Sequence, residues 1–154
     1  MLAPKTIQDA LVAKYRAVSA LVALMKDGSS ANISAYIDEW PKKADLLEAV
    51  REMDPGTMLV AHQETGPANL ARMEVWRHRF SVYLKPLGLM SDAWVQIVNG
   101  IPSGGDGLPM YLTEITAGLH RMDTPTIRRQ FLPVNEFTVI DYFEISISFA
   151  EKGF

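Results

Sequence analysis

The stretch FTVIDYFEISISFA, residues 137–150, alternates apolar and polar side chains close to the end of the chain. Phe143, Ile145, Ile147 and Phe149 fall at every second position, and glutamate and serine residues separate them. A period of two places successive side chains on opposite faces of a β-strand. The sequence therefore predicts a long strand over 137–150 with one face turned toward a core.

A second segment, Glu74–Leu84, has the same alternation. Its apolar face is made of Trp76, His78, Phe80, Val82 and Leu84. The opposite face is mostly polar, as in an antiparallel strand with one solvated side. Apolar runs predict further strands at Thr57–Gln63, ended by a turn at Thr65–Pro67, and at Thr126–Leu132, with Tyr111–Ile115 as a weaker candidate.

Apolar residues at steps of three and four predict helices elsewhere. The clearest helix runs over residues 6–26 before a stop at Gly28. Its stripe consists of Ile7, Leu11, Tyr15, Val18, Val22 and Met25. Shorter helices are predicted at 45–53 and from Ser91 through Val98. Residues 29–44 are ambiguous and include a candidate short strand at 35–37.

The order of these elements predicts the fold class. Two helices precede two strands, and a third helix precedes two or three more strands. This order is typical of an α+β fold with an antiparallel sheet and helices packed on one side. No repeat or linker divides the chain, so we expect residues 1–154 to form a single domain.

The composition excludes several functional classes. The chain has 154 residues, 48% of them apolar and 21% charged, and its formal net charge is −3. The absence of cysteine excludes disulfide frameworks and thiolate zinc sites. The longest uncharged run, Ala93–Gly105, has 13 residues and is too short to cross a bilayer. A net negative charge argues against a domain built mainly to bind nucleic acid.

The three histidines offer little for catalysis or metal binding. His62, His78 and His120 show no metal-ligand spacing, and the sequence predicts no cofactor. His78 lies on the apolar face of its strand, where a general base could be sheltered. The alternative is a half-buried histidine satisfied by one hydrogen bond, and the sequence favours this interpretation.

Charged and glycine-rich positions supply the other candidates. Arg77 and Arg79 lie on the polar face of their strand and could form a basic surface for DNA or an acidic protein, or a simple solvated face. Asp141 shares a face with apolar residues, so we expect it to lie beyond the covered part of the sheet or to have a cationic partner. The loop 103–109 could wrap a phosphate, but no helix follows it, and a mobile loop is the favoured interpretation.

The order of these elements resembles that of the tail terminator (tail completion) proteins of tailed phages. The resemblance rests on the helix Thr6–Met25, the strand Val75–Leu84 followed by Lys85-Pro86, the helix begun by Ser91, and the ending Arg128–Pro133 and Asp141–Phe149. It covers most of the chain but includes no invariant motif. Residues 28–56 depart from the shorter members of the family and look like an insertion.

The resemblance implies a structural role in the phage neck. It implies a homo-oligomer, commonly a hexameric ring, that caps the tail tube protein and meets a head-tail connector or stopper protein. The place of action would be the virion tail, after assembly in the host cytoplasm, with DNA in the ring lumen as a further candidate partner. The family has no catalytic residues, so we expect no enzyme activity, and no membrane partner is implied.

A physical argument points to the same role. A long final strand with one apolar face has an edge that must be covered, and a neighbouring subunit in a closed ring would cover it. The predicted interface residues are Arg77, Arg79, Arg128, Arg129, Gly104, Gly105, Asp106, Gly107, Asp141, Phe143 and Phe154. For Asp141 the hypothesis is an ion pair at this interface.

Two alternatives stay open at this point. The chain could be another neck component, such as a stopper or connector subunit. It could also be a small α+β enzyme or ligand-binding domain that uses His78 and a nearby carboxylate, which predicts a discrete pocket around His78.

Overall fold

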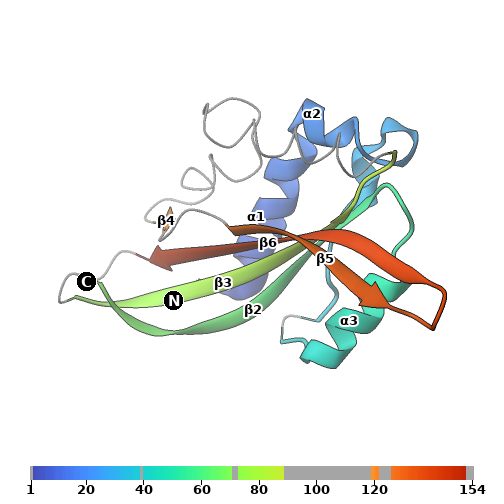
Figure 1. Ribbon diagram of the computed structural model, residues 1–154. Helices are drawn as coiled ribbons and strands as arrows, with labels where there is room; N and C mark the ends of the chain where they lie inside the picture. The colour runs from blue at the N-terminus through green and yellow to red at the C-terminus, as the bar shows by residue number, and fades with distance from the viewer. Residues whose placement is uncertain (1, 39, 71–72, 89–118, 122–125, 152–154) are drawn as a thin grey trace.

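The computed structural model describes residues 2–38, 40–70, 73–88, 119–121 and 126–151. The described strands form one sheet (Figure 1). They are β1 (Ile33–Ala35), β2 (Thr57–Leu70), β3 (Met73–Lys85), β4 (Leu119–Arg121), β5 (Thr126–Pro133) and β6 (Val139–Glu151). Their order is β1-β2-β3-β6-β4, and β5 also pairs with β6. All neighbours are antiparallel except β1 and β2, so the predicted α+β class with a mostly antiparallel sheet is confirmed.

The first predicted helix is interrupted. Helix α1 spans Pro4–Arg16 and α2 spans Ser19–Val22, separated by extended backbone at Val18. A single helix over 6–26 was therefore wrong. Val18, Leu21 and Met25 are all buried in the same core as α1, and the break allows the chain to turn and keep them there. Two short 3-10 turns, Lys26–Gly28 and Ser30–Asn32, lead from this region into β1.

The main core lies between the sheet and the first two helices. Figure 1 shows α1 crossing one face of the sheet. The largest fully buried side chains there come from α1, β3 and β6, and include Ile7, Leu11, Tyr15, Phe80, Phe143 and Phe149. These are the residues that the two alternating segments and the helical stripe placed inside. The burial of this surface supplies most of the hydrophobic stabilisation of the domain.

A second, smaller core lies on the other face of the sheet. Helix α3 (Lys43–Glu52) buries Leu46 and Val50 against Ala61, Tyr83 and Tyr142. The prediction that all helices pack on one side holds for α1 and α2 and is wrong for α3. The apolar stripe of α3 covers the tyrosines on a face that was predicted to be mostly polar. Residues 28–56 thus supply both an edge strand and a covering helix.

Strand β2 continues through the predicted turn. Thr65, Gly66 and Pro67 pair with His78, Arg77 and Trp76 of β3, after a bulge between His62 and Glu64. No described strand pairs with the outer side of β2 at Pro67, so its missing N–H costs no ladder hydrogen bond. The predicted helix from Ser91, the loop 103–109 and the candidate strand Tyr111–Ile115 lie outside the described residues.

Strand β6 is an interior strand. Residues 143–150 pair with β3 on one side, and residues 139–146 and 149–151 pair with β5 and β4 on the other. The prediction of a final strand with a bare edge was therefore wrong, and so was the argument for oligomerisation that used it. The chain covers this edge itself because β5 folds back on β6 as a hairpin.

Candidate functional site

The hairpin of β5 and β6 projects beyond the rest of the sheet. Pairing between β6 and β3 ends at Phe143 opposite Leu84, whereas pairing between β6 and β5 continues to Val139 opposite Pro133. We term residues 130–142 the hairpin tip. Its turn is closed by the Val134 N–H, which donates to the Thr138 carbonyl at 2.9 Å. Figure 1 shows this hairpin extending at the end of the sheet near α3.

The hairpin tip exposes an unusual amount of apolar surface. Phe137 is 92% exposed, Phe131 59%, Val139 54% and Val134 48%. Phe131 and Val139 lie on the face that α1 covers elsewhere, but here no described helix covers them. Contiguous exposed apolar patches on a folded domain commonly mark interaction sites.

An ion pair stiffens the base of the hairpin tip. The Arg129 Nε donates to both carboxylate oxygens of Asp141, at 3.0 and 3.1 Å, and its Nη2 also contacts Oδ2. This hydrogen bonding raises the pKa of Arg129. The guanidinium carbon lies 5.2 Å from the ring centre of Phe131. The prediction that Asp141 has a cationic partner is confirmed, but the partner belongs to the same chain.

A groove lies beside the hairpin tip, at the end of the sheet. We term it the end groove, and its volume is about 450 Å³. It is lined by Arg51, Met53, Pro55, Lys85, Pro86, Gly88, Ile140 and Asp141. Its lining joins the end of α3, the end of β3 and the start of β6. Met53, the prolines and Ile140 give it an apolar wall, and Arg51 and Lys85 give it positive charge.

Lys85 is buried in the wall of the end groove. Only 7% of its surface is exposed, and its Nζ donates to the Met53 carbonyl at 2.7 Å. Desolvation lowers the pKa of Lys85, and the nearby charge of Asp54 partly offsets this effect. No described carboxylate forms an ion pair with this ammonium, although the charge of Asp54 is near, so an incoming negative charge would stabilise it.

The backbone beneath the end groove is fixed by Gly56. Its φ of +81° is a conformation that favours glycine, and an added Cβ would lie 2.5 Å from the Lys26 nitrogen. The Gly56 N–H donates to the Lys85 carbonyl at 2.6 Å, and its carbonyl accepts from the Lys26 N–H at 2.9 Å. These hydrogen bonds connect the segments around Lys26, Gly56 and Lys85, so the backbone that forms the groove is held in place by the fold.

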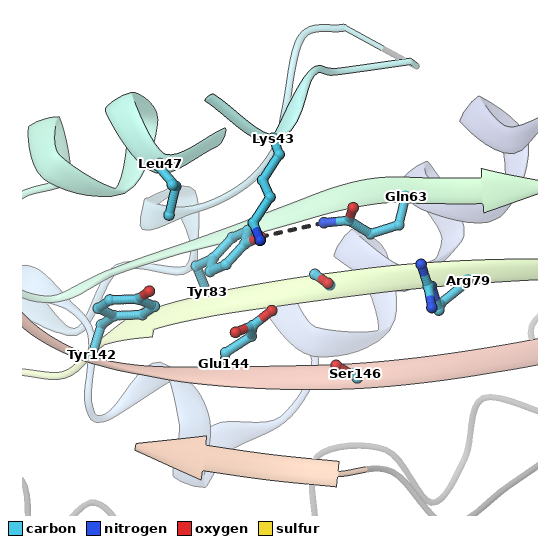
Figure 2. A pocket seen from close by; sticks show the side chains of 9 residues that line it. Lys43, Leu47, Gln63, Arg79, Tyr83, Tyr142, Glu144 and Ser146 are labelled. Carbon is cyan, nitrogen blue, oxygen red and sulfur yellow. Dashed lines mark hydrogen bonds between the residues drawn. The ribbon is translucent and has the colours of Figure 1, made fainter. Parts of the chain in front are cut away.

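A second cleft lies under α3 on the opposite face from α1. Figure 2 shows Lys43 and Leu47 of α3 above the strands, with Arg79, Glu144 and Ser146 across the cleft. Its volume is about 380 Å³. The rings of Tyr83 and Tyr142 are 6.1 Å apart, and Gln63 donates to the Tyr83 hydroxyl at 3.3 Å. Burial, and then the charge of Glu144, raises the pKa of Tyr83 to about 12.

The four predicted arginines do not form one patch. Arg77, Arg79 and Arg128 lie on the α3 side of the sheet, and Arg129 lies on the other side. Arg79 forms an ion pair with Glu64 at 3.2 Å, just as Arg129 does with Asp141. Two of the four are therefore partly neutralised within the chain.

The other predicted interface residues are either buried or outside the described residues. Phe143 is fully buried in the core beside α1, so it has no surface to offer a neighbouring subunit. Gly104, Gly105, Asp106, Gly107 and Phe154 lie outside the described residues, and nothing in the structure places them.

His78 belongs to a buried chain of hydrogen bonds. Its Nε2 lies 2.9 Å from Glu151 Oε1, its Nδ1 lies 2.8 Å from Thr65 Oγ1, and that oxygen lies 2.7 Å from Nε2 of His62. Glu151 also accepts from the Leu2 N–H. Because a carboxylate accepts, the consistent tautomer has the proton of His78 on Nε2 and the Thr65 hydroxyl donating to Nδ1.

These hydrogen bonds bear on both interpretations of His78, the catalytic base and the buried histidine with a structural role. The carboxylate that a catalytic role requires is present, and Glu151, His78 and Thr65 stand in the order of a catalytic triad. However, both ring nitrogens of His78 are already satisfied, the ring is fully buried, and neither cleft described above is lined by it. These hydrogen bonds connect Leu2, just before α1, and His78 of β3 with Glu151 at the end of β6, which is a structural role.

Sequence reasoning missed the hairpin tip and the end groove. Phe137 and Val139 belong to the alternating segment 137–150, and the sequence did not identify them as an exposed surface. Asp141, between Val139 and Phe143, was the one signal that the cover over this face ends before the turn.

Neither known protein-family models nor curated proteins match this sequence. In the described part of the chain, no three acidic or histidine side chains cluster in a way that could hold a metal ion. The described helices are too short or too polar to cross a membrane.

Proposed function

We propose that this chain is a structural phage neck protein, a tail terminator that forms a closed ring on the tail tube and joins it to the head connector. The observation that carries the proposal is the exposed apolar hairpin tip, whose four large side chains are between 48% and 92% exposed. Exposed apolar side chains do not stabilise a monomer in water. In an assembly, their burial against a neighbouring subunit is favourable.

The stiffness of the tip supports an assembly role. The bidentate pair of Arg129 and Asp141 and the closed turn at Val134 hold the apolar side chains in one arrangement. A preorganised surface loses little conformational freedom when it binds. A rigid projection next to a groove is also the shape expected of a subunit that contacts its neighbours head to tail.

The resemblance supplies the specific assignment to the phage neck. Of the elements on which it rests, the structure contains α1, β3, β5 and β6, whereas the first helix is interrupted at Val18 and the helix begun by Ser91 lies outside the described residues. A stopper or connector subunit of the same neck is the sibling hypothesis, and it uses the same surfaces.

Native mass spectrometry with negative-stain imaging tests this proposal. We expect the purified chain to form a closed ring, or to form one when mixed with tail tubes, and the rings should sit at tube ends. A protein that stays monomeric at micromolar concentration and does not bind tubes would contradict the proposal. A ring that binds the connector but ignores the tube would favour a stopper.

A second candidate function has one observation in its favour. Thr65, His78 and Glu151 have the hydrogen-bond order of a nucleophile, a base and an orienting acid, and Thr65 is only partly buried. A ligand-binding or hydrolytic site at Thr65 predicts a retained ligand or turnover of an activated ester, lost in Thr65→Val. Equal behaviour of the two proteins would remove this candidate.

A further inference from the structure

We infer that the hairpin tip of one copy docks into the end groove of the next copy, with Phe137 between Met53, Pro55 and Pro86. This inference rests on the proposed ring, and it names the two surfaces that form the subunit contact. It commits to a second copy of this chain as the occupant of the groove.

The groove has the size and lining for the tip. A volume of about 450 Å³ lies within the range of pockets that enclose a small ligand, so a phenylalanine ring fits. The apolar side of the groove consists of Met53, Pro55, Pro86 and Ile140. Burial of a phenylalanine against such a wall is favourable because it removes apolar area from water on both partners.

The charges of the two surfaces are complementary. Glu136 is the single ionisable residue between positions 130 and 140, so the end of the tip is negative. The groove contains the buried Lys85, whose Nζ donates to the Met53 carbonyl and lies near the charge of Asp54, and Arg51 at its rim, which forms an ion pair with Glu48 at 3.2 Å. Its one acid, Asp141, is already neutralised by Arg129. An incoming Glu136 would therefore meet the ammonium of Lys85, with which no described carboxylate forms an ion pair.

The tip does not fill the groove of its own chain. Phe137 in the turn is 92% exposed, although Ile140, three residues later, lines the groove. Among the described residues, neither of these two surfaces is covered by another part of the chain, and each copy can donate a tip to one neighbour while it receives a tip from another. Such a head-to-tail contact closes into a ring if the rotation between copies allows it.

The area buried by the tip determines how stable a single pair of subunits is. Two partly exposed phenylalanines and two valines can bury on the order of 400 Å², since an aromatic side chain buries 150–250 Å². A stable interface requires about 800 Å² per partner. The tip alone therefore gives a weak pair, and a stable ring needs every copy to contact two neighbours.

Disulfide trapping tests this contact directly because the chain contains no cysteine. Phe137→Cys and Pro55→Cys place one thiol on each surface, and both positions are exposed. Asp9→Cys on α1 is the matched control, since its side chain is also exposed. On mild oxidation, we expect a mixture of the Phe137→Cys and Pro55→Cys proteins to give a cross-linked dimer that the mixtures with Asp9→Cys do not give.

The chain that carries both substitutions separates this inference from the proposed ring. A ladder of covalent oligomers supports both. A product that stops at the dimer supports the tip-to-groove contact and contradicts the ring. Rings seen by native mass spectrometry without cross-linking above the control overturn the contact and leave the ring standing.

A charge exchange provides a second test that does not depend on thiols. Glu136→Lys should raise the protein concentration at which half the chains are assembled by roughly tenfold, the effect of losing a contact worth about 1.4 kcal/mol. Arg51→Glu in the same chain should recover part of that loss. No change in Glu136→Lys, or a loss that Arg51→Glu makes worse, would overturn the inference.

Discussion

The two halves of β6 continue the same alternation into different surroundings. In residues 143–150, the side chains of Phe143, Ile145, Ile147 and Phe149 are at most 1% exposed, while Val139 in the first half is 54% exposed. Helices α1 and α2 cover this face in the second half of β6, and no described helix covers the same face in the first half. The alternation of a strand therefore tells which residues share a face, and only the tertiary structure tells whether that face is covered.

The largest expected change in the free energy of unfolding comes from replacing a phenylalanine in the covered part of β6, compared with one at the hairpin tip. Phe143→Ala should lower the free energy of unfolding by about 3–5 kcal/mol because it opens a cavity in a packed core. Phe137→Ala should change it by less than about 0.5 kcal/mol, because the side chain is already in water. Urea unfolding of both variants, at a concentration where the chain is monomeric, measures the difference. Equal losses would show that the tip packs inside its own subunit.

The next effect concerns the polar contacts at the two ends of β6. Thr65→Val should cost about 3 kcal/mol, because buried nitrogens of His62 and His78 each lose the hydroxyl between them. At the other end, Arg129→Gln should cost much less, because an exposed ion pair contributes little to the free energy of unfolding. Thermal unfolding of the two variants gives the comparison. A larger loss in Arg129→Gln would mean that the hairpin tip, not the buried chain, holds β6 in place.

The α3 side of the sheet should respond to alkaline pH. The pKa of Tyr83 rises from 10.0 to about 12 in the folded state, so the folded protein keeps a proton that the unfolded chain releases. This stability is complete below pH 10 and is lost as the pH rises toward 12, by up to about 3 kcal/mol. Urea unfolding at pH 9 and pH 11.5 should therefore show a smaller loss in Tyr83→Phe than in the natural chain. Identical losses would assign the effect to other groups.

Much of the fold could be predicted from the sequence. The strands at Glu74–Leu84 and Thr126–Leu132 and the helix at 45–53 differ from β3, β5 and α3 by no more than two residues at either end. Local periodicity determines these elements. The break at Val18 and the passage of β2 through Pro67 could not be predicted, because they depend on what lies beside the chain in space.

The candidate site was harder to predict for the same reason. Arg129 and Asp141 were both identified as candidates, but their pairing depends on the register of β5 with β6. The end groove combines residues from three elements that are far apart in sequence, such as Met53, Lys85 and Ile140. Sequence periodicity carries no information about such combinations.

The smallest expected change in stability comes from a tyrosine of α1 in the main core. The Tyr15 hydroxyl is fully buried beneath α1 and has no hydrogen-bond partner among the described residues. Burial raises the pKa of this hydroxyl. Because a buried hydroxyl without a partner costs desolvation energy, Tyr15→Phe should leave stability at pH 7 unchanged or raise it by up to about 1 kcal/mol.

The gain from Tyr15→Phe should grow above pH 10. There the unfolded chain releases the Tyr15 proton and the folded chain does not, so the natural protein loses stability that the variant keeps. Urea unfolding at pH 7 and pH 11 measures both effects, and Tyr36→Phe on a half-buried tyrosine is the matched control. A loss of more than about 1 kcal/mol in Tyr15→Phe at pH 7 would mean that the hydroxyl bonds to a group outside the described residues. The packing of α1 on residues 143–149 of β6 would then include a hydrogen bond of the Tyr15 hydroxyl as well as apolar contacts.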